Sequence, residues 1–319
     1  MRRAAAGGDG PLRYPPDLIR RIRGAHTDVR MTFRGPEDGP QVLLVPGLGA
    51  TRRIFEINDR QTLPDLLLER GFRVLAVEFR THWRDRHQSL ASLMEVLHAA
   101  TADLGPLDLV GHSLGGMLAL GLAAEGLPIQ RIVTMGSGLD YRGGPSTFAP
   151  ALGLIPFARR AGLTRGLPVK RAARTLAALG GGPTLLGRRD QFHPGNTSLH
   201  SQRRAYGEAI GDIPLPLLLD LGGLFSDPGL LLPDGRSLRD ASAQLPQPVL
   251  AIGGRHDRQC PVAAVEHLAD LVPDGRALIV GDDAVGYGHI DMLTAAHAVH
   301  AVFATAADFL LLRSPGATA

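Results

Sequence analysis

The chain has 319 residues, of which 44% are hydrophobic, so it can bury a substantial core in one large domain with an insertion or in two small domains. Its 34 basic and 31 acidic residues give a formal net charge of +3. No apolar run reaches the roughly 18 residues that a membrane span needs, so we expect no membrane span.

The N-terminal sequence and the cysteine content indicate the cellular compartment of the protein. The first ten residues begin with two arginines but contain no apolar segment, so we expect a tail rather than a secretion signal. Cys260 is the only cysteine of the chain, which excludes an internal disulfide and fits a reducing environment. We therefore predict a cytoplasmic protein.

The first half of the chain alternates between buried-strand patterns and amphipathic patterns. Residues 15–23 carry apolar side chains at helical spacing, so residues 1–26 are predicted to form an N-terminal tail and a short helix. Strands are predicted at 27–33, 41–45, 72–79, 108–110 and 131–135, and helices at 63–70, 89–104 and 117–124. This strand–helix–strand order with short connections favours a parallel sheet.

The alternation stops within residues 141–245, where proline and glycine are frequent and the helical segments are short. It returns with strands at 248–252 and 276–280 and helices at 262–271 and 290–312. We predict an α/β protein whose doubly wound, mostly parallel sheet is built from residues 27–140 and 246–313. Residues 141–245 are then an inserted, mainly helical cap, and residues 314–319 a disordered tail.

The segment Gly111-His112-Ser113-Leu114-Gly115 matches G-x-S-x-G between a predicted strand and a predicted helix. That context is typical of a nucleophile elbow, a sharp turn whose strained serine tolerates only small residues two positions away on either side. Ser113 is therefore the candidate nucleophile, and His112 is expected to orient the turn. The alternative is an ordinary strand–helix turn that happens to contain a serine.

A serine nucleophile needs a base and an acid that orients the base. His289 and Asp257 both follow predicted strands, and the chain order serine, acid, histidine matches the arrangement known for such elbows. Asp257 could instead cap the helix that begins near Pro261, and Asp140 is a rival acid. His297 and His300 lie three positions apart and are expected on a helix surface or in packing.

Two backbone N–H groups are needed to hold the negative oxygen that forms during acyl transfer. The residue after the nucleophile, Leu114, is one candidate. Leu48 is the other, because it lies between Gly47 and Gly49 in the loop after the strand at 41–45. A plain turn at the end of a strand is the alternative for Leu48.

Four motifs in order resemble those of the α/β-hydrolase superfamily: Pro46-Gly-Leu-Gly, Gly111-His-Ser-Leu-Gly-Gly, Gly254-Arg-His-Asp and Gly288-His-Ile-Asp. The resemblance covers roughly residues 30–140 and 245–312 and implies a Ser-His-Asp triad, an oxyanion loop and a variable cap. A weaker similarity, through residues 71–80, links the chain to the polyhydroxyalkanoate-synthase-like branch. The nucleophile of those synthases is cysteine, so Ser113 favours hydrolysis or acyl transfer.

The predicted cap is strongly basic between residues 141 and 204, with eleven basic residues and only Asp190 as an acid. It could bind an anionic substrate group such as a CoA thioester, or an acyl carrier protein. The alternative is a solvated helical face in an arginine-rich chain. No nucleic-acid-binding motif accompanies the charge, so we expect no nucleic-acid partner.

These observations predict a serine hydrolase that cleaves an apolar carboxylic ester or thioester through an acyl-enzyme. Neither a metal-ligand cluster nor a dinucleotide-binding pattern is present in the sequence, so no metal and no cofactor are expected. One alternative is an acyltransferase that passes the acyl group to an acceptor other than water in secondary metabolism. Another is a non-catalytic protein of the same fold that binds a hydrophobic ligand.

Overall fold

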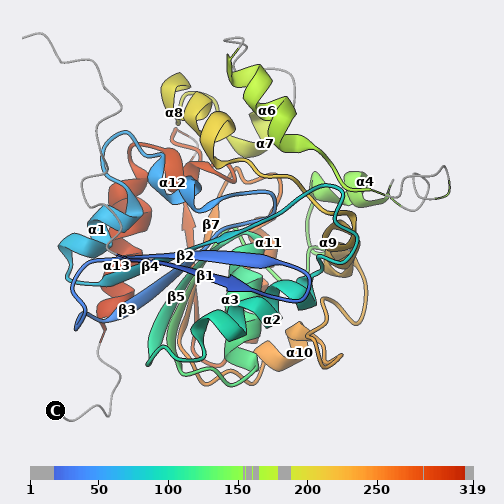
Figure 1. Cartoon of the computed structure of the whole chain (residues 1–319). Helices are drawn as coiled ribbons and strands as arrows, with labels where there is room; N and C mark the ends of the chain where they lie inside the picture. Colours follow the sequence, from blue (N-terminus) through green and yellow to red (C-terminus); the bar gives the residue numbers. More distant parts are fainter. Residues whose placement is uncertain are drawn as a thin grey trace, which may run out of the picture.

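The computed structural model describes residues 18–153, 155, 160, 165–178, 188–282 and 284–312. Its centre is an eight-stranded sheet in the order β1-β2-β4-β3-β5-β6-β7-β8 (Figure 1). The strands are β1 (Leu18–Arg23), β2 (Asp28–Arg34), β3 (Gln41–Val45), β4 (Arg73–Phe79), β5 (Leu107–His112), β6 (Ile129–Met135), β7 (Val249–Gly254) and β8 (Gly275–Val280).

Six neighbouring strands of the sheet, β4, β3, β5, β6, β7 and β8, run parallel to one another. β1 pairs antiparallel with β2, and β2 pairs antiparallel with β4. Short apolar strands alternate with helices along the core. Each parallel pairing needs a crossover, because the chain must return to the end of the sheet where the strands begin. The predicted doubly wound, mostly parallel α/β sheet is confirmed. All parallel strands therefore end at one edge, where loops after β3, β5, β6, β7 and β8 meet.

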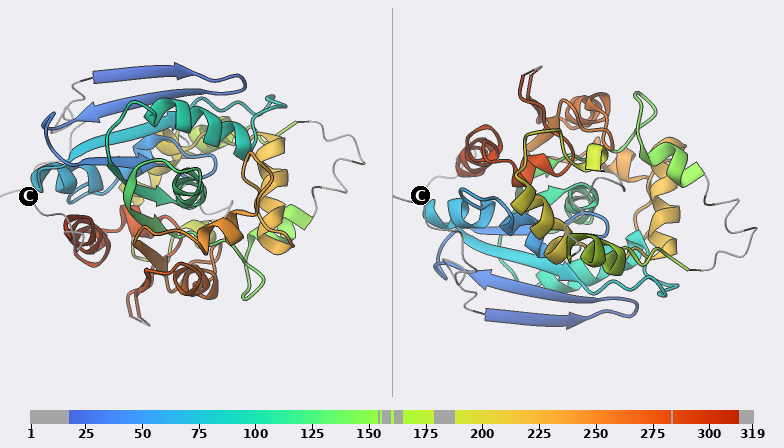
Figure 2. Two further views of the ribbon diagram at one scale, coloured as in Figure 1. Left: turned by 90° about the horizontal axis from the view of Figure 1, so that it is seen from below. Right: turned by 90° about the horizontal axis from the view of Figure 1, so that it is seen from above.

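Helices cover both faces of the sheet (Figure 2). One buried cluster joins the sheet to α2 (Leu90–Thr101), α3 (Leu114–Ala124) and α11 (Val262–Leu271). A second cluster, on the opposite strand faces, joins it to α1 (Leu63–Glu69), η4 (Val299–Phe303) and α13 (Ala304–Leu311). The alternation of Val42 and Leu44 with Leu43 and Val45 along β3 shows how one strand supplies both clusters.

The short helix predicted at residues 15–23 is wrong where the structure describes it, because residues 18–23 form the edge strand β1. Only Ile22 of its apolar residues packs against the core, while Leu18 and Ile19 are exposed. The spacing of these three residues suits a short helix, but the open edge of β2 offers backbone hydrogen bonds along the whole segment. Residues 1–17 lie outside the described part.

The single long helix predicted at residues 290–312 is also wrong, because the structure divides it into α12 (Asp291–Thr294), η4 and α13. Ala295 is extended, with φ −69° and ψ 141°. Its carbonyl oxygen accepts a hydrogen bond of 2.6 Å from the Asn58 side chain. A contact with a distant segment therefore ends the helix, which local spacing does not reveal. The predicted disordered tail at 314–319 lies outside the described residues.

The segment between β6 and β7 contributes no strand to the sheet in its described residues and is mainly helical. Its elements are α4 (Phe148–Gly153), α6 (Val169–Ala178), α7 (Arg188–Gln191), α8 (Leu199–Arg204), η2 (Ala205–Ala209), α9 (Leu215–Asp220), η3 (Leu221–Phe225) and α10 (Leu238–Ser242). In Figure 1, α6 and α8 lie above the carboxyl edge of the sheet, whereas α10 lies near its opposite end. Among the described residues, no helix is long and apolar enough to cross a membrane.

Candidate active site

Ser113 occupies the turn between β5 and α3 in a strained backbone conformation. Its φ of 54° and ψ of −122° make it the only residue other than glycine with positive φ in the described part of the chain. The turn is fixed by two bonds, from Ser113 N–H to the Met135 carbonyl at 2.8 Å and from Ser137 Oγ to the Ser113 carbonyl at 2.7 Å. Such strain persists only where surrounding contacts enforce it.

The glycines of the G-x-S-x-G motif are required by close backbone contacts. A Cβ atom on Gly111 would lie 2.3 Å from the Gly115 carbonyl group, and one on Gly115 would lie 2.0 Å from the Val45 carbonyl oxygen. Gly116 packs against Ser137, whose Oγ would lie 2.2 Å from an added Cβ. The motif thus lets the start of α3 pack directly on the neighbouring strand ends.

His289 and Asp257 are in direct contact, with His289 Nδ1 2.7 Å from Asp257 Oδ2. Both side chains are almost completely buried. A carboxylate can only accept, so Nδ1 carries the proton and Nε2 presents its lone pair. The second oxygen, Asp257 Oδ1, accepts from the N–H groups of Gln259 at 2.8 Å and Cys260 at 3.0 Å. Asp257 therefore holds its own loop and the histidine at once.

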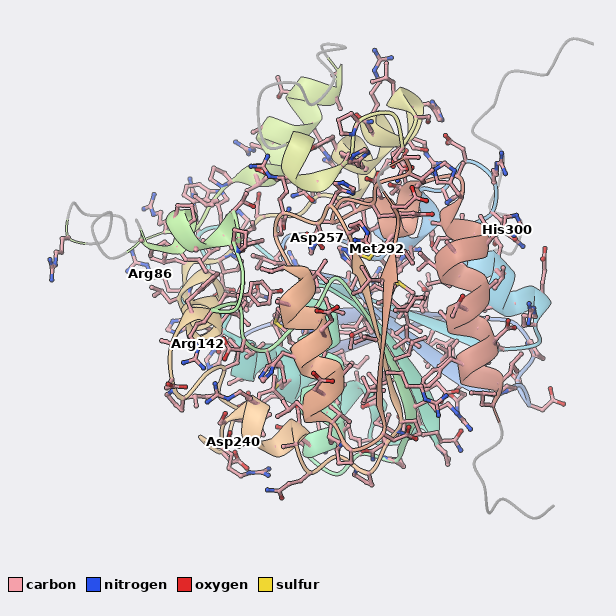
Figure 3. All side chains as sticks on the ribbon, turned by 180° about the vertical axis from the view of Figure 1, so that it is seen from behind. Arg86, Arg142, Asp240, Asp257, Met292 and His300 are labelled. Atoms are coloured by element: carbon pink, nitrogen blue, oxygen red, sulfur yellow. The ribbon has the colours of Figure 1, made fainter. Side chains whose placement is uncertain are left out.

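The imidazole of His289 lies beside the elbow. It packs on Gly136, where an added Cβ would lie 3.1 Å from ring atoms Cε1 and Nδ1. Gly136 directly follows Met135, the residue that accepts the Ser113 N–H bond. Figure 3 shows Asp257 and Met292 at the upper end of the strands, beneath helices of the segment between β6 and β7. Ser113, His289 and Asp257 thus lie at one corner of the carboxyl edge.

The rival acid Asp140 is engaged elsewhere. Its carboxylate forms hydrogen bonds with the Arg142 guanidinium and lies 3.3 Å from Arg239. The bonds from Arg142 hold the pKa of Asp140 well below its usual range. Arg142 and Arg239 also pair with Asp227, so these four side chains form a surface ion cluster. The site geometry therefore favours Asp257 over Asp140 as the partner of His289.

The other histidines considered from the sequence have different surroundings. His297 Nε2 bonds to the Asn196 side chain, and His300 lies exposed in η4. His112 is buried, and its Nε2 lies 3.0 Å from the carbonyl oxygen of His289. Of these three, only His112 contacts a residue of the candidate triad.

The two candidate oxyanion donors are Leu114, at the start of α3, and Leu48, in the loop after β3. Leu114 is the first residue of α3, so its N–H has no acceptor within that helix. Leu48 lies in a turn that closes with a bond of 3.1 Å from Ala50 N–H to the Gly47 carbonyl, and Gly49 has a φ of 60°. An added Cβ on Gly47 would lie 2.9 Å from Ser113 Cβ. The Leu48 turn therefore stands next to the elbow.

The loop that contains Leu48 is held by the segment that follows η2. Gly211 N–H donates to the Gly49 carbonyl at 2.7 Å, and Thr51 N–H donates to the Ala209 carbonyl at 2.8 Å. We call residues 209–213 the bracing segment. Paired backbone bonds also join Ile213 of this segment to Leu167.

Asp291 is a site residue that the sequence reasoning missed. Its Oδ2 accepts from His193 N–H at 2.6 Å and Gly288 N–H at 2.8 Å, and its Oδ1 accepts from Thr197 Oγ1 at 2.5 Å. Burial raises the pKa of Asp291, and these hydrogen bonds oppose the rise. Asp291 therefore fastens the His289 loop to residues 193–197. Its position two residues after His289, in the motif Gly288-His-Ile-Asp, is the sequence feature that could have indicated its role.

The basic residues of the predicted cap are partly neutralised in the structure. Arg142 belongs to the ion cluster with Asp140, and Arg204 pairs with Glu208 at 3.2 Å. Arg174 donates to the Gly207 carbonyl at 3.3 Å. The side chains of Arg159, Arg188 and Arg189 lie outside the described residues. The described part of the cap is thus less open to an anion than its composition indicates.

The model of the alpha/beta hydrolase family matches residues 42–305, and the chain belongs to that family. The chain is also 32% identical over 135 residues to the magnesium-chelatase 30 kDa subunit of Rhodobacter capsulatus. That match covers 39% of this chain and 45% of the relative, so the chain spans less than half of that protein.

Several solved structures share the fold at low sequence identity. A candidate lipase from Acinetobacter baumannii superposes with a TM-score of 0.65 at 19% identity, covering 92% of this chain and 91% of that chain. A carboxylesterase from Nitrososphaera gargenis gives 0.63 at 17% identity, covering 92% and 97%. Homoserine O-acetyltransferase from Staphylococcus aureus gives 0.58 at 16% identity, covering 94% and 96%. At these sequence identities the similarity supports a shared fold and no more.

Proposed function

We propose that the protein is a serine hydrolase that cleaves an apolar carboxylic ester or thioester through an acyl-enzyme. The observation that carries the proposal is the 2.7 Å contact between His289 Nδ1 and Asp257, beside the strained Ser113. A histidine oriented by a buried carboxylate next to a serine on a strained turn is the arrangement that activates a hydroxyl for attack on a carbonyl.

In the proposed reaction, His289 Nε2 takes the proton of Ser113 as its Oγ attacks the carbonyl carbon of the substrate. Asp257 stabilises the imidazolium that forms. The N–H groups of Leu48 and Leu114 bind the oxyanion, and His289 then gives the proton to the leaving oxygen or sulfur. Water, activated by the same histidine, attacks the acyl-enzyme and frees the acid and Ser113.

An apolar acyl group is proposed because apolar side chains flank the oxyanion turn. Leu48 and Ile213 are only partly buried and pack against the core, and an added Cβ on Gly49 would lie 2.7 Å from Ile213. Phe148, Leu219 and Phe225 of the segment between β6 and β7 are also only partly buried. Such surfaces gain free energy when they cover a hydrocarbon chain, at about 25 cal/mol per Å².

Intact-protein mass spectrometry after treatment with a fluorophosphonate tests the proposal. We expect one adduct on the wild type, located by digestion to the peptide with Ser113, and none on Ser113→Ala. Phenylmethanesulfonyl fluoride, a smaller reagent, should label the same residue if the cap restricts entry. A folded wild type that neither reagent labels would contradict the proposal.

The fate of the acyl group separates hydrolysis from transfer. A chromogenic ester should turn over steadily in water if water deacylates the enzyme, with an initial burst only where deacylation is slower than acylation. A burst without turnover, relieved by an added alcohol or amine, would instead identify an acyltransferase. A ligand that co-purifies with an unreactive protein would favour the non-catalytic binding protein.

A further inference from the structure

A cationic groove lies between the β1–β2 hairpin, the end of β4 and the cap, at the carboxyl edge of the sheet. It encloses a cavity of about 330 Å³. Five cationic side chains and two carboxylates line this groove: Arg21, Arg23, Arg30, Arg80 and Lys170, with Asp28 and Glu78. Lys170, the only lysine of the chain, comes from α6 of the cap.

The strand register brings like charges together in this cationic groove. Arg21 on β1 stands directly opposite Arg30 on β2. Like charges at directly opposed positions of an antiparallel pair destabilise the sheet. Arg30 Nε is also buried without a hydrogen-bond partner. A bound anion would compensate these two directly opposed positive charges.

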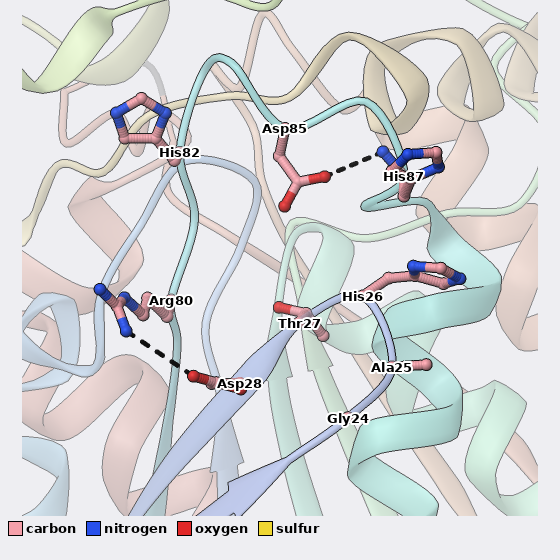
Figure 4. Close-up of a pocket in the computed structure, with 9 residues that line it drawn as sticks. All are labelled: Gly24, Ala25, His26, Thr27, Asp28, Arg80, His82, Asp85 and His87. Carbon is pink, nitrogen blue, oxygen red and sulfur yellow. Dashed lines mark hydrogen bonds and ion pairs between the residues drawn. The ribbon is translucent and has the colours of Figure 1, made fainter.

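Each carboxylate of the groove lies near one cation: Asp28 near Arg80, which also lines the groove, and Glu78 near Arg52. Asp28 lies 3.7 Å from Arg80, and Figure 4 shows this pair at the edge of a neighbouring cavity lined by His26, His82 and His87. Glu78 stands opposite Arg30, but its carboxylate lies 3.7 Å from Arg52 Nε. Within the described part of the chain, Arg21, Arg23 and Lys170 have no carboxylate at ion-pair distance. The groove thus carries uncompensated positive charge.

We propose that this cationic groove binds the phosphate group of a phosphorylated small molecule. Guanidinium groups match phosphate oxygens with paired N–H donors, and an ammonium adds a compact charge. Two opposed arginines and a lysine from a third element surround the cavity, which suits a phosphate or diphosphate better than a single carboxylate. The proposal does not depend on the chemistry proposed for Ser113.

The groove shares its wall with the candidate active site. Thr51 and Gly211 line the groove. Both also take part in the bonds that join the Leu48 loop to the bracing segment. A phosphorylated molecule in the groove would therefore lie next to the backbone that supports the oxyanion turn. Two sources of phosphate fit: the diphosphate of a CoA-type carrier on an acyl substrate, and a separate phosphorylated molecule.

Isothermal titration calorimetry of the full chain with inorganic pyrophosphate, at low ionic strength, tests the proposal. We expect Arg21→Gln and Arg30→Gln each to weaken binding by roughly tenfold or more, because each removes a charged hydrogen-bond donor. Arg20→Gln is the matched control: Arg20 lies on the same strand, but its guanidinium bonds to Asp103 at 2.6 Å instead of lining the groove. The affinity of Arg20→Gln for pyrophosphate should stay within about twofold of the wild-type value.

Thermal unfolding without ligand provides a second measurement. Arg21→Gln should raise the Tm of the free protein, because it removes one member of the repulsive pair. A lower Tm together with a lower affinity would mean that Arg21 has a structural role, and this outcome would overturn the proposal. Arg21 is exposed, so this variant should fold even if Arg30→Gln does not.

Coenzyme A in the same titration distinguishes the two sources. Tighter binding of coenzyme A than of pyrophosphate, lost in Arg21→Gln, would assign the groove to an acyl carrier. Equal or weaker binding would assign it to a separate phosphorylated molecule. Absence of pyrophosphate binding by the wild type, or equal weakening by Arg20→Gln, would overturn the proposal. Ser113→Ala should bind pyrophosphate like the wild type. The titration therefore tests the phosphate site separately from the proposed hydrolase activity.

Discussion

His112 donates a hydrogen bond to the backbone of His289, a residue 177 positions away, at 3.0 Å from Nε2 to the carbonyl oxygen. A carbonyl oxygen only accepts, so Nε2 carries the proton. Burial, together with the nearby His289, lowers the pKa of His112 to about 3. The ring is therefore neutral at neutral pH, where its Nε2–H can donate this bond. The residue before the candidate nucleophile thus holds the backbone of the candidate base.

Replacing His112 tests this positioning role. We expect His112→Ala to lower kcat for an ester by up to roughly 100-fold with little change in KM, because a small displacement of the base mainly affects the chemical step. His112→Gln, whose amide can donate to the same carbonyl, should recover part of the rate.

His98→Ala is the control for the His112 variants, because His98 lies on the exposed side of α2 next to Glu125. It should leave kcat unchanged. Equal losses in His112→Ala and His112→Gln, with a lowered Tm in both, would indicate that the ring is needed only for packing.

The choice between the two candidate acids can be decided by a matched pair of substitutions. Asp257→Asn should lower kcat by roughly 10³- to 10⁴-fold, because an amide no longer holds the His289 tautomer in which Nε2 is the acceptor. Asp140→Asn should stay within about twofold of the wild type, because Asp140 pairs with surface arginines. A strong loss in Asp140→Asn combined with a weak loss in Asp257→Asn would reverse the assignment.

Asp291 is expected to matter for stability as well as for rate. Asp291→Ala leaves the N–H groups of His193 and Gly288 without their acceptor in a buried place. We predict a loss of about 3 kcal/mol in the free energy of unfolding, measured by urea titration. Asp282→Ala, which removes similar bonds to Ala284 and Val285 at an exposed loop, should cost less than about 1 kcal/mol. Similar losses in the two variants would refute a special role for Asp291.

Asp108 predicts a pH dependence of stability that is unrelated to catalysis. It is buried on β5, its Oδ1 has no hydrogen-bond partner, and burial raises its pKa from 3.8 to about 7. Between these values the folded protein keeps a proton that the unfolded chain has lost. The free energy of unfolding should therefore fall as the pH rises from about 4 to 7, by at most about 4 kcal/mol.

Asp108→Asn removes this titration and keeps the shape of the side chain. Its free energy of unfolding should differ less between pH 5 and pH 8 than that of the wild type, and it should exceed the wild-type value at pH 8. Asp270→Asn, on the exposed surface of α11, is the control and should keep the wild-type pH difference. An unchanged difference in Asp108→Asn would show that other groups cause it.

The elements that the sequence predicted well are those fixed by local patterns. The short apolar run at 41–45, which turn residues bound on both sides, predicts the buried strand β3. The glycines around Ser113 are required by contacts within their own turn and with the neighbouring strand. The residues chosen from chain order, His289 and Asp257, lie at the same edge as Ser113. Their catalytic roles remain predictions until the labelling and kinetic experiments are done.

The features that the sequence did not predict depend on distant pairings. Residues 18–23 form a strand because the edge of β2 is open to them. The final helix is interrupted where Asn58 binds the Ala295 carbonyl. Arg21 and Arg30 become neighbours only through strand register. No local spacing contains this information, because each partner is chosen by the packing of the whole chain.

The bracing segment limits how specificity could be changed by exchanging parts between relatives. Residues 209–213 hold the Leu48 loop through Gly49 and Thr51, and they lie within the predicted cap at residues 141–245. A chimera that imports a foreign block for residues 141–245 would replace this support along with the rest of the segment, so turnover should fall for every substrate. A graft that ends before residue 209 would leave the Leu48 loop with its native support.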